Sequence, residues 1–489
     1  MNCTQHITYH VNGKAYPEHL ILPVTPEADE PHHLESGVIN LYPELCYQTI
    51  DGFGGAMTDT ASYLLGKMTP ETREALLREF FTKEGNGFSL IRIPLDSCDY
   101  SVEPYQAVAD PIADPELLTF SMERNFKNIL PAVKEAIALC DQEVSVLVSP
   151  WSPPAQWKTP PARPKNDASV YGAFPGMREK KIDYDTPSRN NGGSLKKEYY
   201  GPWAKYLTKM IEAYLAEGVP VTMMTLQNES IAATGWDSCV WTAADQKEFL
   251  RDHMVPAMKE AGLFGKVGIY IWDHNKERVY EWAREVIDDE TREMIEGIAF
   301  HWYSGDHFET LSMTQDRWPG LKMMMSEMCP LHKPGQVGFM GMFSKKTPET
   351  VEYDDAANYA HDIIGNLNHG MERWIDWNLC VNQDGGPSHA GSGFTASVIA
   401  NEDGSYRKDL IFDYVGHFSK YIRRGAQRIG VSCCDQKVEL TAAKNPDGSI
   451  ALVILNSGTE DQGYAIRICD QVIRISAPVG TISTLMIEE

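Results

Sequence analysis

The chain has 489 residues, of which 43% are hydrophobic and 23% charged, the composition of an ordinary globular protein with a sizeable core. Its 44 basic and 68 acidic residues give a net charge of −24, which disfavours nucleic acid and anionic membranes as partners, and strongly acidic polymers as substrates. No stretch approaches the roughly 18 apolar residues of a membrane span, so none is predicted.

The amino-terminal region, residues 1–48, shows no helical period and carries short strand candidates at Ile7–Val11 and Val38–Leu41. It lacks the cationic start and apolar run of a signal peptide. The ten cysteines of the chain are scattered, without the paired spacing of a zinc site. These features favour a cytoplasmic protein with reduced thiols, although a chain trimmed of its leader would look the same.

Residues 49–424 alternate strand-length apolar runs with amphipathic helical patterns. The eight strand candidates are Ile50–Phe53, Phe88–Ile93, Val144–Val148, Val221–Leu226, Val267–Ile271, Gly297–Trp302, Leu321–Met325 and Arg373–Trp377. The helical patterns between them include Pro70–Phe81, Glu123–Cys140, Pro202–Glu217, Thr242–Ala261, Lys276–Asp288 and Ala356–His369. This alternation predicts an α/β fold, a (β/α)8 TIM barrel whose parallel sheet is buried on both faces.

Two other segments have different patterns. Thr159–Asn191 follows the third strand without any period, and a loop of this length is a contact surface for substrate or subunit, or a solvated excursion. Residues 425–489 return to short strands separated by turns, at Val438–Ala442, Ile450–Asn456, Tyr464–Ile468, Val472–Ser476 and Ile482–Ile487. Residues 1–48 and 425–489 together predict a β-sandwich side domain built from both termini.

Function in such barrels gathers at the carboxyl ends of the strands, and two glutamates stand there. Glu229 closes the fourth strand and Glu327 the seventh, so both should project from the same end of the sheet. Two carboxyl groups facing each other across a cleft form the minimal machinery for cleaving a glycosidic bond. A single Glu at a strand end would more often cap the strand or form an ion pair. The residues at the other strand ends therefore decide between a catalytic and a structural role for the two glutamates.

Aromatic and amide side chains close several of the other strands. Trp151 follows the third strand, Trp377 ends the eighth, and Asn228 precedes Glu229. Aromatic faces stack on the C–H surfaces of sugars and amides bind their hydroxyls, so these residues predict a sugar site, although each Trp alone would more often be a core residue. His301 and His307 suggest a metal site only weakly because a third ligand is missing, and neither a metal nor another cofactor is expected.

These motifs resemble glycoside hydrolase family 30, the family of lysosomal glucosylceramidase and its bacterial relatives. The matching stretches run in order from about residue 50 to 430, and they are Asp51–Asp59, Ile91–Pro94, Ser97–Ser101, Ser149–Pro154, Gln227–Glu229, Ile298–Tyr303, Met325–Cys329, Trp374–Leu379, Gly385–Pro387 and Gly416–Lys420. The resemblance implies a glycosidase with a TIM barrel and a side sandwich, acting on a β-glycoside such as a glucosylceramide of sphingolipid metabolism.

The resemblance also implies roles for individual residues. Glu229 is similar to the family's acid/base and Glu327 to its nucleophile, in a retaining reaction with carboxyl groups about 5–5.5 Å apart. Arg92 beside Glu327 would keep the nucleophile ionised, and burial with a negative neighbour would keep Glu229 protonated. The remaining matches are Asn228 for the sugar 2-hydroxyl, Asp99, Trp151 and Trp377 for the pocket of the terminal sugar, and Arg92 and Tyr303 for hydrogen bonds around the carboxylates.

The substrate stays open at this point. Ser230 stands where many relatives have Pro, Ser388–Ser392 lacks the Asn-rich run of the lysosomal enzyme, and the Thr159–Asn191 loop is longer than expected. An exo-acting β-glucosidase is favoured, with a β-xylosidase or β-fucosidase, or an endo-β-1,6-glucanase, as alternatives within the family. A carbohydrate-binding protein without catalysis would have lost a carboxylate, and both are present. A homo-oligomer would be compatible with the long loop and the side sandwich.

Overall fold

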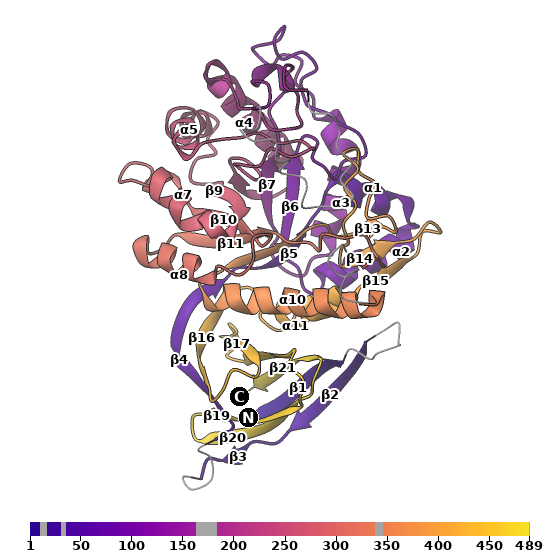
Figure 1. Ribbon diagram of the computed structural model, residues 1–489, viewed down its shortest axis with the longest axis vertical. Coiled ribbons are helices and arrows are strands. Elements are labelled where there is room, and N and C mark those ends of the chain that lie inside the picture. The colour runs from indigo at the N-terminus through magenta and orange to yellow at the C-terminus, as the bar shows by residue number, and fades with distance from the viewer. Residues whose placement is uncertain (10–16, 31–35, 163–182, 338–345, 489) are drawn as a thin grey trace.

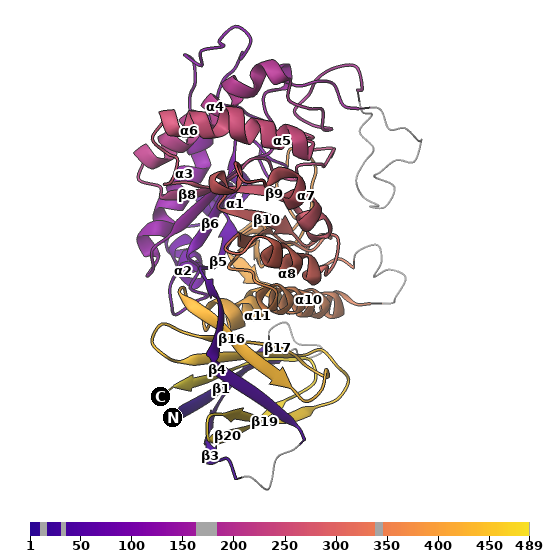
Figure 2. The same ribbon diagram turned by 90° about the vertical axis from the view of Figure 1, so that its left-hand side faces the viewer.

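The computed structural model describes residues 1–9, 17–30, 36–162, 183–337 and 346–488. Figures 1 and 2 show two bodies stacked along the long axis, a barrel ringed by helices and a β-sheet body that holds both chain termini. The helices α10 (Pro348–Asn368) and α11 (Leu410–Ser419) lie between the two bodies. Most of the Thr159–Asn191 loop, residues 163–182, lies outside the described residues.

Eight parallel strands close into the barrel in chain order, which confirms the predicted fold. They are β5 (Gly52–Ala56), β6 (Leu90–Leu95), β7 (Ser145–Pro150), β8 (Val221–Thr225), β9 (Gly268–Asn275), β10 (Gly297–His301), β11 (Lys322–Glu327) and β12 (Arg373–Asp376). β5 and β6 pack so closely that a side-chain carbon at Gly54 would lie 1.9 Å from the carbonyl oxygen of Leu90. Only glycine fits at this position of the barrel.

Helices connect these strands on the outside of the barrel. They are α1 (Asp59–Lys67), α2 (Pro70–Phe81), α3 (Glu123–Leu139), α4 (Tyr200–Ala216), α5 (Ala243–Phe249), α6 (Val255–Glu260), α7 (Val279–Val286) and α8 (Phe308–Arg317). α2 has the predicted bounds, because Thr69 caps its first turn and Pro70 needs no backbone donor there. The helix predicted over Thr242–Ala261 is confirmed as one helical run, within which a π turn at Leu250–Met254 lies next to Pro256, which has no N–H for the helical ladder.

The second body is built from strands at both ends of the chain. One ten-stranded sheet runs in the order β2, β1, β21, β18, β17, β16, β4, β19, β20, β3. Its strands are β1 (Asn2–Tyr9), β2 (Glu18–Val24), β3 (Glu27–Ala28), β4 (Val38–Ile50), β16 (Ala426–Cys433), β17 (Glu439–Lys444), β18 (Ile450–Asn456), β19 (Gln462–Ile468), β20 (Gln471–Ala477) and β21 (Thr481–Glu488). β20 also touches β18 and β21, which are not its neighbours in the sheet, so the sheet folds over an apolar core as a sandwich.

The amino-terminal prediction was less accurate than the carboxyl-terminal one. β1 starts earlier than Ile7, and the end of the predicted strand Ile7–Val11 lies outside the described residues. β4 continues to Ile50 and leads the chain from the sandwich into the barrel. A small sheet of β13 (Val381–Asn382), β14 (Val398–Ala400) and β15 (Tyr406–Lys408) was not predicted.

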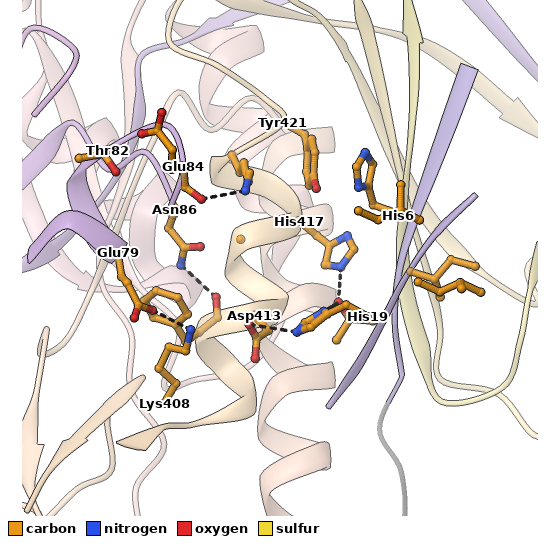
Figure 3. Close-up of a pocket in the computed structure, with 18 of the residues that line it drawn as sticks. His6, His19, Glu79, Thr82, Glu84, Asn86, Lys408, Asp413, His417 and Tyr421 are labelled. Carbon is orange, nitrogen blue, oxygen red and sulfur yellow. Dashed lines mark hydrogen bonds and ion pairs between the residues drawn. The ribbon is translucent and has the colours of Figure 1, made fainter. Parts of the chain in front are cut away.

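A cavity of about 670 Å³ opens where the sandwich meets the barrel, between β1, β2, α2 and α11. Figure 3 shows His417 of α11 pointing toward the sandwich strands, where its Nε2 lies 2.7 Å from Oγ1 of Thr8. His19 and Asp413 face each other across 3.7 Å, and Lys408 bonds Glu79 at 2.6 Å. Two pairs of charged groups on its wall thus bond each other, and none of the predicted site residues lines this cavity.

Two further observations bear on the surroundings of the protein. Among the helices of the described residues, none is long and apolar enough to cross a membrane. The ten cysteines are all free thiols in this structure.

Candidate active site

The predicted site residues converge at the carboxyl end of the barrel. Glu229 follows β8 and Glu327 ends β11, and the side chain of each is about nine-tenths buried. Nδ1 of His301, at the end of β10, lies 3.6 Å from Oε1 of Glu229 and 4.0 Å from Oε1 of Glu327. Both carboxylates therefore face the same imidazole, and the two oxygens are no farther apart than these two distances together.

Arg92 of β6 is fully buried and donates hydrogen bonds to several of the site residues. Its Nη1 donates to Oε2 of Glu327 at 2.8 Å, and its Nη2 donates to Oδ1 of Asn228 at 2.8 Å and to Oδ2 of Asp273 at 2.9 Å. Tyr303 donates its hydroxyl proton to Oε1 of Glu327 at 3.1 Å. Arg92 and Tyr303 thus hold one oxygen each of the Glu327 carboxylate, in the arrangement that the sequence analysis expected around a nucleophile.

Asp273 and His274, near the end of β9, were missed by the sequence analysis. Asp273 accepts from Arg92, from Oγ of Ser326 at 2.5 Å and from Nε2 of His301 at 3.1 Å. His274 places Nδ1 at 3.6 Å from Oε1 of Glu229. A signal existed, since the predicted fifth strand stops directly before the segment Trp272–Asn275, whose acid and imidazole follow an apolar run as at the other strand ends.

A β-bulge in β9 turns Asp273 inward, whereas strict alternation of side chains along the strand would turn it outward. The pairing of β9 with β10 shifts by one residue after Trp272, and Trp272 and Asp273 both have positive φ, at 74° and 53°. Trp272 consequently packs on Trp282 of α7, with ring centroids 4.7 Å apart, while Asp273 bonds Arg92. Glu229 also has a positive φ of 51°, and such strained non-glycine residues gather at functional sites.

Burial opposes ionisation of both carboxyls, and the charges around each decide the outcome. At Glu229, His274 and His301 outweigh burial and lower the pKa. At Glu327, burial outweighs His301 and Arg92, is reinforced by the negative charge of Glu229, and raises the pKa. The two pKa values are therefore shifted in opposite directions, down at Glu229 and up at Glu327. The sequence analysis expected the reverse and was wrong, because it did not place two imidazoles beside Glu229.

His301 carries positive charge in this setting. Burial would lower its pKa, but the negative charges of Glu327, Asp273 and Glu229 outweigh burial and raise the pKa to about 9. Burial lowers the pKa of His274 despite its contact with Glu229. His307, the weak metal partner suggested by the sequence, instead precedes α8 as its N-cap residue.

Aromatic rings form one wall of the site. Trp151 and Trp377 stack with centroids 5.2 Å apart and an interplanar angle of 20°. The guanidinium of Arg92 lies over both rings, at 4.8 Å and 5.4 Å from their centroids. Asp99 is buried nearby, and burial together with the negative charges of Glu327, Glu229 and Asp237 raises its pKa well above the usual range. The wall thus combines flat apolar faces with a buried carboxyl group, as a sugar pocket requires.

The rim loops are tied to one another by buried polar contacts. Asp237, after β8, accepts from Arg189 at 2.7 Å and lies 2.9 Å from Nε2 of His389. Ser388 donates its hydroxyl proton to the carbonyl oxygen of Asp99 at 2.5 Å. Lys158 bonds the carbonyl oxygens of Arg189 and Ser238, joining the base of the long loop to the loop after β8. The segment Ser388–Ser392 therefore closes over the Asp99 side of the site.

A barrel with two buried carboxylates facing each other beside stacked tryptophans, all at the carboxyl ends of its strands, has the architecture of a glycoside hydrolase. Comparison with known families agrees. Residues 50–422 match the glycosyl hydrolase family 30 TIM-barrel domain, and residues 425–485 match the glycosyl hydrolase family 30 beta sandwich domain. The chain belongs to glycoside hydrolase family 30 and is a glycosidase.

The names of individual relatives differ in the substrate that they give. Lysosomal acid glucosylceramidase of Mus musculus is 30% identical over 441 residues, which cover 87% of this chain and 78% of the mouse protein. An endo-1,6-β-D-glucanase of Trichoderma harzianum is 24% identical over 425 residues, covering 85% of this chain and 79% of the fungal one. Among solved structures, SrfJ from Salmonella typhimurium superposes with a TM-score of 0.86 at 28% identity, with all of both chains covered.

Proposed function

We propose that this protein is a retaining, exo-acting β-glycosidase that hydrolyses β-D-glucosides through a covalent glycosyl-enzyme. The observation that carries the proposal is the approach of Glu229 and Glu327 to the same nitrogen of His301, within 3.6 and 4.0 Å. Retention needs carboxyl groups about 5–5.5 Å apart, whereas inversion needs room for a water between groups about 6.5–9.5 Å apart. The sum of the two distances bounds the separation of the two Oε1 atoms, which fits the retaining spacing and excludes the wider part of the inverting range.

In this proposal Glu327 is the nucleophile and Glu229 the acid/base. Arg92 and Tyr303 orient the Glu327 carboxylate toward the anomeric carbon. Glu229 gives its proton to the leaving oxygen and later takes one from the attacking water. The acid step needs the proton on Glu229, against the direction of the two pKa shifts in the substrate-free protein.

The remaining polar groups and rings would bind the terminal sugar. Asn228, whose Oδ1 accepts from Arg92, would bind the 2-hydroxyl, where hydrogen bonds strengthen in the transition state. Asp99 would bind a hydroxyl farther round the ring, and Trp151 and Trp377 would stack beside it.

The test is hydrolysis of p-nitrophenyl β-glucoside, xyloside, fucoside and galactoside, and of a glucosylceramide, with the first-formed sugar followed by proton NMR. We expect turnover of the glucoside with the β-anomer appearing first. Glu327→Ala should abolish it, while Glu296→Gln, a carboxylate bonded to Lys322 at the opposite end of the barrel, should keep it. An α-anomer as first product would overturn the retaining mechanism, and a preference for xyloside or fucoside would overturn the glucose assignment.

An endo-β-1,6-glucanase is the second candidate, supported by the similarity to the Trichoderma enzyme. Such an enzyme would leave the monomeric aryl glycosides untouched and shorten β-1,6-glucan to oligosaccharides. Following the sizes of the products from β-1,6-glucan therefore separates the two candidates, because an exo-acting enzyme releases only glucose from the chain end.

A further inference from the structure

Three metal-ligating atoms converge on one point of the active site. Oε1 of Glu229 lies 3.6 Å from Nδ1 of His274 and 3.6 Å from Nδ1 of His301. All three atoms lie within 4.8 Å of one another. In a tetrahedral zinc site with metal–ligand distances near 2.0–2.1 Å, neighbouring ligand atoms are roughly 3.3 Å apart. Small rotations of these side chains would bring the three atoms to that spacing.

Both imidazole nitrogens are buried and lack a hydrogen-bond partner among the described residues. His301 is fully buried, so its Nδ1 cannot turn to solvent. Buried polar atoms in proteins are nearly always hydrogen-bonded, whereas these two nitrogens have only long ion-pair contacts, of 3.6 Å each, to one carboxylate oxygen. A cation bound between them would satisfy all three atoms.

The surroundings of His301 resemble the support of a metal ligand. Its other nitrogen, Nε2, lies 3.1 Å from Oδ1 of Asp273, which also bonds Arg92 and Ser326. A carboxylate that accepts from the far nitrogen of a histidine is a pairing that recurs around metal-bound histidines. Here it would keep the proton on Nε2 when a metal displaces the proton that His301 carries on Nδ1. Asp273 therefore holds His301 in the orientation that a metal ligand needs.

We infer that Glu229, His274 and His301 form a binding site for Zn²⁺ or a similar divalent transition metal, and that occupancy inhibits the enzyme. Two imidazoles and one carboxylate form a ligand set that proteins use for zinc, and the Irving–Williams order favours Cu²⁺ and Zn²⁺ over Mn²⁺. Binding displaces any proton on the ligand atoms and ties up the carboxylate that must donate to the leaving oxygen. The metal is an inhibitor in this scheme and takes no part in the reaction.

The test is titration of the substrate-free protein with Co²⁺, whose tetrahedral complexes absorb in the visible range. We expect one site, displaced by Zn²⁺, with affinity falling at least about 100-fold in His274→Gln, because one of three ligands is lost. Glu229→Gln is a second variant with the same expected direction, should the first fail to fold. His307→Gln, which removes a histidine outside the cluster, should bind like the wild type.

A second group of residues also has metal-ligating atoms, so cobalt binding there must be separated from binding at the active-site cluster. Cys433, Cys434 and Asp435 also place ligand atoms within 4.8 Å of one another. All titrations are therefore repeated in a Cys433→Ser, Cys434→Ser background, where we expect the absorption to persist. Cobalt absorption that disappears in this background, or that is unchanged in His274→Gln, would overturn the inference.

Activity supplies an independent measurement. Zn²⁺ should inhibit hydrolysis of a substrate that the enzyme is found to use, chelator should reverse the inhibition, and His274→Gln should shift the inhibiting concentration upward at least about 100-fold. Equal inhibition of His274→Gln and wild type would count against the site. Since cobalt binding is read without substrate, a failure of the proposed glucosidase activity leaves this inference separately testable.

Discussion

Two adjacent layers inside the same barrel have opposite chemistry. The lower layer is apolar, and its side chains are Leu90, Leu147, Met223, Tyr270, Ala299, Met324 and Ile375. Two residues farther along each of several strands, the upper layer is polar. Asp273 accepts from Arg92, Thr225 and Ser326, and Ser149 accepts from Arg92. Both layers are fully buried, so burial does not distinguish them.

The difference between the layers reflects what each has to do. The lower layer closes the barrel with side chains that need no partner, so it tolerates changes that keep its volume. The upper layer keeps a charge buried only because each of its groups is bonded to another, and removing one leaves its partners unpaired. That layer in turn positions Glu327 and Asn228 through Arg92. The polar layer is thus the support of the site, and the apolar layer the support of the fold.

The largest expected effect is on catalysis. Glu229→Gln should slow hydrolysis of glycosides with poor leaving groups, such as methyl β-glucoside, by about 10²–10⁴-fold, because no group then protonates the leaving oxygen. A dinitrophenyl glucoside, which leaves without a proton, should form the glycosyl-enzyme at a nearly normal rate, visible as a burst of dinitrophenol. Equal slowing of both substrates in single-turnover kinetics would contradict the acid role.

Removing Asp273 should damage the polar layer itself. Asp273→Ala leaves the buried guanidinium of Arg92 without one of its two carboxylate partners and should cost about 3–5 kcal/mol of unfolding free energy. Urea denaturation followed by circular dichroism measures the change. Asp289→Ala, at an exposed position, is the control and should change stability little. A loss below about 1 kcal/mol in Asp273→Ala would mean that the layer does not depend on this pairing.

A cavity in the apolar layer should affect stability but not chemistry. Met223→Ala, on β8 below the site, should cost about 2–5 kcal/mol, because its volume cannot be refilled in a closed barrel. Activity per folded molecule should stay near that of the wild type, measured with active-site titration. Met313→Ala, at a half-exposed position of α8, is the matched control. A loss of activity per folded molecule in Met223→Ala would erase the distinction between the layers.

The smallest effect concerns the contact between barrel and sandwich. His361 of α10 lies 2.5 Å from Glu439 of β17, and this bond with Asp306 nearby raises the pKa of His361 to about 9. The stabilisation is therefore fully present below about pH 6.5 and is lost as the pH rises through 9. Because both side chains are about one-third exposed, His361→Gln should cost less than about 1 kcal/mol at pH 6 and nothing near pH 10. A cost that grows with pH would contradict this pairing.

The sequence by itself was enough to identify the barrel. Each of the eight apolar runs became a barrel strand, because a parallel sheet covered on both faces requires continuous hydrophobic segments that solvent-exposed strands lack. The glutamates and tryptophans were found for the same reason: they directly follow or end such runs, and strand ends of one direction meet at one end of a barrel.

Tertiary structure alone decided how these residues act on one another. The bulge in β9 turns Trp272 outward and Asp273 inward, which a strict two-residue alternation does not predict. It also brings His274 beside Glu229, and with His301 this reverses the predicted order of the two carboxyl pKa values. The residue types and their strand ends can be read along the chain, but a pKa depends on distances of a few ångströms between strands, which only the closed barrel sets.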